Sequence, residues 1–114
     1  MSRIWHITKR EQWEHAQTAQ VYFSESLASE GFIHCSTQEQ VLPTANFLFR
    51  GQQDLVLLGI DSSKVQPEIR YEDVDGTTFP HIYGALNTDA VIEVLDFPPG
   101  VDGLFELKLS DFTP

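Results

Sequence analysis

Short apolar segments bounded by polar residues or glycine are the main pattern along this chain, and they predict strands. The longest apolar run, residues 55–60, has the length of one buried strand. Asp75-Gly76 is typical of a tight hairpin turn between two strands. The predicted strands cover residues 4–7, 21–23, 32–35, 54–60, 68–72, 90–97 and 104–109.

Two hydroxyl residues, each three positions before a glutamate, predict the starts of two helices. Thr8 with Glu11, and Ser36 with Glu39, have the spacing of a capping box. In that motif the hydroxyl and the carboxylate bond the free amides at the helix start. The helices predicted from these motifs cover about residues 10–18 and 37–49.

A shorter helical turn over residues 24–31 is expected to end at Gly31, because glycine readily adopts the left-handed cap conformation. Pro43 is expected to split or kink the helix that contains it. Helices gather in the first half and hairpin-linked strands in the second. This order predicts an α+β fold with a mixed or antiparallel sheet. No linker or change in composition divides the chain, so we expect a single domain over residues 1–114.

Three of the four histidines, His6, His34 and His81, lie in apolar strand-like segments. A buried imidazole needs hydrogen-bond partners, so each is either paired within the core or used in a site. His6 and His34 share one order along the chain: a strand, the histidine, a hydroxyl (Thr8 or Ser36) two positions later, and a helix. Alternate strand residues share a face, so each histidine and its hydroxyl should lie beside a helix N-terminus that favours anions.

The second half of the chain supplies further candidates. His81 and Tyr83 would share a strand face, where a tyrosine can stack on a planar ligand and still use its hydroxyl. Arg70 could bind a phosphate or carboxylate as a two-pronged donor. Glu72 and Glu93 are the candidate catalytic carboxylates. The alternative reading of His81 and Tyr83 is a packed hairpin turn. Arg70 fits a surface ion pair with Glu72, and both glutamates fit solvated strand positions better than a catalytic role.

Composition narrows the class of protein. The chain has 17 acidic and 7 basic residues, a net charge of −10, and its basic residues are scattered. This pattern argues against nucleic-acid binding, which depends on clustered lysine and arginine. The start has no signal-peptide pattern, and no apolar run approaches the ~20 residues that span a bilayer. We therefore expect a cytoplasmic protein without membrane association.

The single cysteine, Cys35, excludes an intrachain disulfide and is interpreted as a small core residue. A zinc site formed by His6, His34 and His81 is conceivable, since three imidazoles can hold zinc with an open position. The chain lacks the local histidine spacings that mark such sites, so no metal is expected.

Several strings of the chain together resemble the bacterial family called domain of unknown function 952. They follow one another in order over nearly the whole chain, and the Phe-Ile-His-Cys-Ser string ending at Ser36 and the Pro-His-Ile-Tyr-Gly string ending at Gly84 are distinctive. The matching segments are residues 4–8, 26–36, 54–58, 70–72 and 79–87.

The same segments are distantly similar to the ADP-ribosyltransferase fold, which implies a split sheet and an NAD site. The strand with His6 is similar to the one that places a histidine on the NAD ribose and nicotinamide. The strand and helix around His34 and Ser36 are similar to the second motif, with Tyr22 or Tyr83 as the stacking partner. The third motif requires a glutamate on a later strand, and Glu72 and Glu93 both remain candidates for it.

The leading hypothesis is a protein that binds a nucleotide-like or phosphorylated small molecule, with NAD as the cofactor that the resemblance implies. Catalysis would then be an NAD-dependent, ADP-ribosyltransferase-like transfer. A non-catalytic binding or protein-interaction module with structural histidines is the alternative, and a metal-dependent hydrolase is a third. The sequence leaves the oligomeric state open. The cleft is expected to be lined by His6, Thr8, His34, Ser36, Arg70, His81 and Tyr83.

Overall fold

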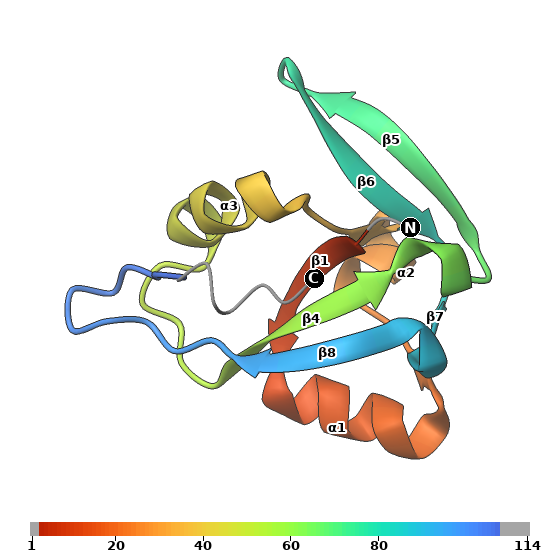
Figure 1. Ribbon diagram of the computed structural model, residues 1–114, viewed down its shortest axis with the longest axis horizontal. Helices are drawn as coiled ribbons and strands as arrows, with labels where there is room; N and C mark the ends of the chain where they lie inside the picture. Colours follow the sequence, from red (N-terminus) through yellow and green to blue (C-terminus); the bar gives the residue numbers. More distant parts are fainter. Residues whose placement is uncertain (1–2, 108–114) are drawn as a thin grey trace.

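A three-stranded antiparallel sheet in the order β1-β4-β8 forms the centre of the protein (Figure 1). The computed structural model describes residues 3–107. All seven residues of β4, the middle strand, are buried, as expected for an apolar run packed on both faces. The strands of this sheet are β1 (Arg3–Lys9), β4 (Leu55–Asp61) and β8 (Val91–Asp96).

A second antiparallel sheet has the order β3-β6-β5, and its β5–β6 hairpin projects from the body of the protein (Figure 1). Asp75 and Gly76 make the predicted turn with φ angles of 51° and 88°, a conformation that aspartate tolerates and glycine favours. A short ladder pairs β2 with β7. These strands are β2 (Val21–Tyr22), β3 (Ile33–His34), β5 (Glu68–Val74), β6 (Thr77–Tyr83) and β7 (Leu86–Asn87).

The two sheets are joined where β1 runs beside the chain that leaves β3. The Trp5 amide donates to the Ser36 carbonyl at 2.8 Å, and the Ser36 amide donates to the Trp5 carbonyl at 2.7 Å. The Cys35 amide donates to the Pro80 carbonyl at 3.0 Å, which continues the pairing of this segment with β6. Residues 35 and 36 therefore connect the two sheets through backbone hydrogen bonds.

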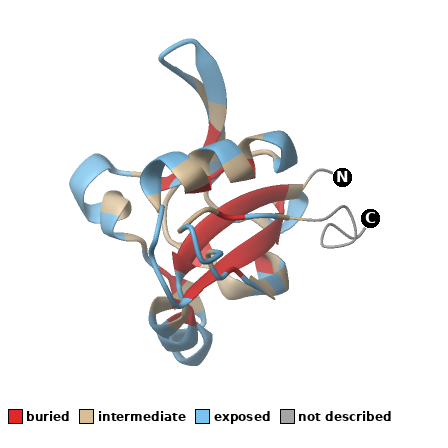
Figure 2. Ribbon diagram, turned by 90° about the vertical axis from the view of Figure 1, so that its left-hand side faces the viewer, coloured by how far each residue is buried: buried red, intermediate tan, exposed pale blue. Residues whose placement is uncertain are grey.

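Two hydrophobic clusters, one on each face of the central sheet, form the core. Even-numbered residues of β4, such as Leu58, pack with Trp13 and with Ile82 of β6. Odd-numbered residues, such as Leu57, pack with Val41. Figure 2 shows the buried strands crossing the middle of the protein between exposed helical surfaces. The helices are α1 (Arg10–Ala19), α2 (Glu25–Glu30) and α3 (Val41–Leu48).

The α+β class, the antiparallel pairing and the helix-rich first half are confirmed. Helix α2 ends at Gly31, which has a φ of 90° and donates its amide to the Ser26 and Leu27 carbonyls, as predicted. No helix within residues 3–107 is long and apolar enough to cross a membrane.

Both predicted capping boxes are wrong in detail. Strand β1 continues to Lys9, which becomes the N-cap of α1, and the Thr8 hydroxyl bonds the Gln12 side chain instead. The second capping box lies one residue later than predicted, between Thr37 and Gln40.

The helix predicted over residues 37–49 is a 3-10 turn followed by α3, the helix of residues 41–48. Pro43 lies in the first turn of α3, where its missing amide costs little, so it does not split the helix. The strand predicted over 104–109 is wrong for residues 104–107, which have no strand structure, and residues 108–109 lie outside the described range.

Gly59 of β4 faces the Trp5 indole so closely that a larger residue cannot fit. A Cβ atom at this position would lie 2.8 Å from Trp5 Cζ3 and 3.1 Å from Glu93 Cβ. We predict that Gly59→Ala lowers the free energy of unfolding by about 1–3 kcal/mol, measured by urea denaturation. In a Trp5→Phe background, which lacks the clashing ring atoms, the same substitution should cost less. Equal costs in both backgrounds would contradict this account.

Candidate functional site

Strand alternation in the β3-β6-β5 sheet places a set of chemically active side chains on one face. His81 of β6 pairs with His34 of β3 on one side and with Arg70 of β5 on the other. Residues two positions away along each strand point the same way. The intervening residues, such as Ile33 and Ile82, point into the core. We name this set the histidine face; it consists of Phe32, His34, Arg70, Glu72, His81 and Tyr83.

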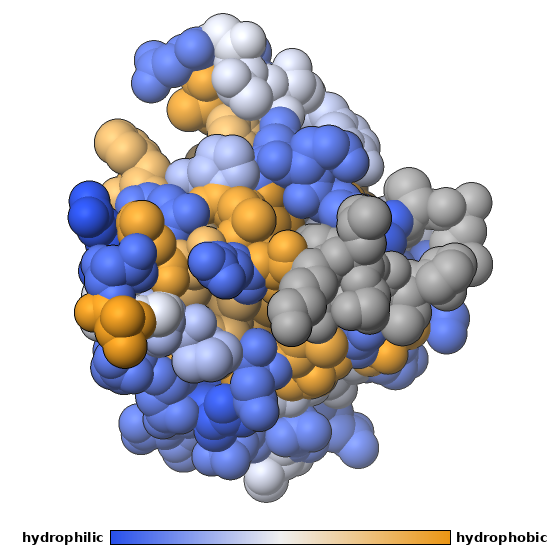
Figure 3. Space-filling model, turned by 60° about the vertical axis from the view of Figure 1, so that its left-hand side comes forward, coloured by the Kyte–Doolittle hydropathy of each residue, from blue (hydrophilic) through white to orange (hydrophobic). Residues whose placement is uncertain are grey.

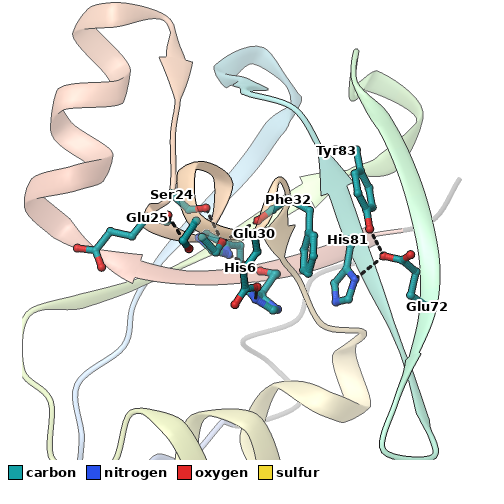
Figure 4. A network of polar contacts seen from close by, with 11 residues as sticks. His6, Ser24, Glu25, Glu30, Phe32, Glu72, His81 and Tyr83 are labelled. Carbon is teal, nitrogen blue, oxygen red and sulfur yellow. Dashed lines mark hydrogen bonds and ion pairs between the residues drawn. The ribbon is translucent and has the colours of Figure 1, made fainter.

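Glu72 is the hub of the histidine face, and His81 and Tyr83 both turn toward it (Figure 4). Its Oε1 atom lies 2.8 Å from His81 Nδ1 and accepts a hydrogen bond from the Tyr83 hydroxyl at 2.5 Å. The bonds from Tyr83 and His81 stabilise the carboxylate and lower the pKa of Glu72. The bond to Glu72 in turn raises the pKa of Tyr83. Glu72 is therefore ionised at neutral pH and acts as an acceptor.

Aromatic rings pack around His81. The Phe32 ring stacks on it with centroids 4.2 Å apart and an interplanar angle of 22°. The His34 ring meets it edge-on at 5.2 Å, and Phe32 also contacts Tyr83 at 5.2 Å. His81 is 3% exposed, and its Nε2 atom has no hydrogen-bond partner among the described residues.

The rim of the histidine face is open to solvent. The His34 side chain is 54% exposed, and its Nε2 atom lies 2.6 Å from Glu30 at the end of α2. The Arg70 guanidinium lies 4.2 Å above the Tyr83 ring and donates to Glu68 at 3.1 Å. The side chains of His34 and Arg70 are thus partly exposed and within reach of a ligand lying across the sheet.

His6 does not lie on the histidine face but in a buried hydrogen-bond chain behind it. Its Nδ1 atom is 2.5 Å from the His34 carbonyl, and its Nε2 atom is 2.8 Å from the Tyr22 hydroxyl. This series of hydrogen bonds continues from the Tyr22 hydroxyl to the Thr8 hydroxyl at 2.8 Å and from Thr8 to the Gln12 side chain at 2.9 Å. A carbonyl can only accept, so Nδ1 carries a proton and donates to His34.

Burial lowers the pKa of His6 to about 4, despite the opposing effect of the His34 carbonyl, so the ring is neutral at pH 7. The Tyr22 hydroxyl lies 2.8 Å from both His6 Nε2 and the Thr8 hydroxyl, and it donates to Thr8. His6 therefore supports the backbone of His34 rather than reaching a ligand directly. Tyr22 is 1% exposed, which leaves Tyr83 as the tyrosine of the histidine face.

The other candidate residues also lie apart from the histidine face. Ser36 is buried and pairs with Trp5 through its backbone. Glu93 is on β8, where it accepts a hydrogen bond from Arg3 at 3.0 Å, so Glu72 is the candidate glutamate that adjoins a histidine. Cys35 is buried in the core as predicted, and burial raises the pKa of its thiol.

The expectation that His6 and His34 both lie beside a helix N-terminus is wrong. The His6 ring contacts Tyr22, and the His34 ring contacts Glu30 in the last turn of α2. The hypothesis of a three-histidine zinc site is not supported either. Within residues 3–107, no three histidine, cysteine, aspartate or glutamate side chains gather closely enough to hold a metal ion.

Phe32 was not among the residues predicted for the site. It lies two positions before His34, so strand alternation alone places it on the same face. Two hollows in the described surface lie elsewhere: one is between α1 and β8, and the other follows residues 95–107.

The low pKa of His6 predicts a specific pH dependence of stability. Between pH 6.5 and pH 4 the unfolded chain binds a proton at His6 and the folded protein does not. Stability is thus fully present above pH 6.5 and falls by roughly 3 kcal/mol as the pH drops to about 4. Urea denaturation of wild type and His6→Gln across this range measures the effect.

The His6→Gln variant should show a flatter pH dependence than wild type. His15→Gln is the matched control, because His15 is exposed on α1 and should leave the slope unchanged. An equal slope in His6→Gln and wild type would show that His6 does not titrate as described.

Comparison with known proteins identifies relatives of this chain. It is similar to the crystal structure of protein CC0527 from Caulobacter crescentus, with 32% identity over 92% of this chain and 94% of that one, and a TM-score of 0.85. The solution NMR structure of CC0527 is 33% identical over 91% of both chains, with a TM-score of 0.79. No curated protein matches. The profile of a family described as "protein of unknown function (DUF952)" matches residues 7–94, and the chain belongs to that family.

Proposed function

We propose that the protein binds a nucleotide-like or phosphorylated small molecule on the histidine face, with NAD as the leading candidate. The observation that supports this proposal is the gathering of His34, Arg70, Glu72, His81 and Tyr83 from three strands onto one face. The opposite face of the same sheet already supplies the core packing, so folding alone does not require this set of side chains. Such gatherings of titratable and aromatic groups are typical of ligand sites.

Each part of the histidine face fits a part of such a ligand. The half-exposed Arg70 guanidinium can hold a phosphate with two parallel hydrogen bonds. The half-buried Tyr83 offers a ring surface for a planar base. The ionised Glu72 favours a cationic group, such as the nicotinamide ring of NAD.

The finer form of the proposal is ADP-ribosyl transfer from NAD, as the resemblance to those enzymes implies. NAD would supply the ADP-ribosyl group, and nicotinamide would leave. Glu72 is the candidate that stabilises the positive charge developing on the ribose, since charges fixed near a reacting centre lower its barrier. His6 takes the part of a positioning residue because it holds the His34 carbonyl from behind.

A protein-interaction module is the second candidate function, and a different surface favours it. Apolar side chains gather on the face of the protein that carries α3 (Figure 3). Phe47 and Leu48 at the end of α3 are 85% and 61% exposed. This surface is formed by α3 and is not part of the β3-β6-β5 sheet, so the two functions can be tested separately.

Titration with NAD and with ADP-ribose, followed by NMR, tests the proposed function. We expect millimolar ligand to shift the signals of His34, Arg70 and Tyr83. Arg70→Gln should weaken binding about tenfold, which corresponds to the loss of one charged hydrogen-bonding partner of about 1.4 kcal/mol. Arg50→Gln is the matched control, because Arg50 is exposed in the loop after α3.

Unchanged signals on the histidine face at millimolar concentrations of both ligands would rule out the proposal. If the Arg70→Gln and Arg50→Gln variants bind the ligand with equal affinity, the ligand does not bind at the histidine face. If the protein binds a second copy of itself or a partner protein, and Phe47→Ala abolishes that binding, the interaction module is favoured instead.

A further inference from the structure

We infer that His81 is a hydrogen-bond acceptor of the histidine face, and that its Nε2 atom accepts a hydrogen bond from a sugar hydroxyl on the bound ligand. In this arrangement Glu72 orients the imidazole and Phe32 covers it until a ligand arrives. The inference rests on the proposed function, because it concerns the same face and specifies which chemical group of the ligand lies where.

The contact with Glu72 fixes which nitrogen of His81 carries a proton. Glu72 accepts hydrogen bonds from both Tyr83 and His81 through its Oε1 atom. An ionised carboxylate can only accept, so His81 Nδ1 must donate. In the neutral ring the Nε2 atom therefore keeps its lone pair. A carboxylate that fixes a histidine tautomer in this way also stabilises the ring once it gains a second proton.

The Nε2 atom of His81 is buried and has no partner within residues 3–107. Buried polar atoms are almost always hydrogen-bonded, and an exception needs an explanation. The other ring nitrogen is bonded to Glu72, so the imidazole is held in place, and in the neutral ring one acceptor is unused. A hydroxyl from a ligand would complete its hydrogen bonding.

Phe32 covers the imidazole but does not belong to the core. Its ring stacks on His81 and also touches His34 edge-on at 4.8 Å. Phe32 is partly exposed and is absent from both hydrophobic clusters of the described residues. It directly follows Gly31, whose left-handed conformation ends α2. The Phe32 ring can therefore turn outward without opening the core, and a planar ligand group can take its place.

The arrangement also sets the direction in which a ligand lies. An unprotonated Nε2 atom accepts a hydrogen bond from a hydroxyl and disfavours an anion. Arg70 is the direct cross-strand neighbour of His81, and its guanidinium carries a fixed positive charge. A phosphate therefore belongs at Arg70 and a sugar hydroxyl at His81, which are adjacent positions on the sheet.

No covalent bond changes in this contact. The sugar hydroxyl keeps its proton and donates a hydrogen bond to His81 Nε2, while Glu72 continues to accept from Nδ1 and holds the ring in place.

NMR of protein labelled with 15N in its histidines tests the tautomer and the contact separately. In the protein without ligand we expect His81 to be protonated at Nδ1 and not at Nε2. Glu72→Ala should shift the population toward the Nε2-protonated form, while the control Glu68→Ala, on the same strand, should not. A wild-type His81 protonated at Nε2 would overturn the inference.

Two probes then locate the ligand groups. ADP-ribose, which carries both phosphates and sugar hydroxyls, should shift the His81 Nε2 resonance and the Arg70 signals. Inorganic pyrophosphate, which has no hydroxyl, should shift Arg70 only. Shifts at Arg70 and Tyr83 without any change at His81 Nε2 would overturn this inference and leave the proposed function standing. If no residue of the histidine face shifts, both this inference and the proposed function are ruled out.

Replacement of the cover tests the role of Phe32. Phe32→Ala should tighten ADP-ribose binding, so that half-saturation needs a ~2- to 10-fold lower concentration. This change corresponds to the free energy of one aromatic stack, which the ligand no longer has to displace. Phe47→Ala is the control, since Phe47 is exposed on α3. Weaker binding by Phe32→Ala would show that Phe32 is a platform for the ligand and would overturn its role as a cover.

Discussion

The join between the two sheets is the constraint on which the rest of this structure depends. Trp5 and Ser36 exchange two backbone hydrogen bonds, and His6 adds a third contact to the carbonyl of His34. Together these bonds hold the short strand β3 between the central sheet and the β5–β6 hairpin. Through β3 the hairpin gains a third strand, and a two-stranded hairpin alone is barely stable in water. The position of His34 beside His81 follows from the same connection.

His6 and His34 have the same local sequence pattern but different roles, because their strands have different surroundings. Strand β1 is packed on both faces, so His6 is buried, neutral and bonded on both nitrogens. Strand β3 is packed on one face only, so His34 reaches solvent and contacts a carboxylate. One of the two histidines therefore supports the other.

Much of this fold could be predicted from the sequence, since strand alternation and turn residues act locally. The run of residues 55–60, the Asp75-Gly76 turn and the Gly31 helix end were all readable in this way. The two capping boxes were not, because they depend on where β1 and the segment after β3 end, and sheet pairing sets those ends. The contact between Glu72 and His81 depends on the register of a hairpin. The participation of Arg70, Glu72, His81 and Tyr83 in a site was a prediction, but their meeting point required the structure.

Two adjacent residues, His34 of β3 and Cys35 directly after it, point to opposite faces of the sheet. The His34 side faces solvent, while Cys35 faces the core, where burial keeps its thiol protonated and unreactive toward oxidants and alkylating agents. Cys35 is the only thiol of the chain, and it lies within the segment that joins the two sheets. The rate at which the Cys35 thiol is alkylated therefore measures how often this connecting segment opens. The chain thus contains a natural probe for local unfolding of the segment that connects its two sheets.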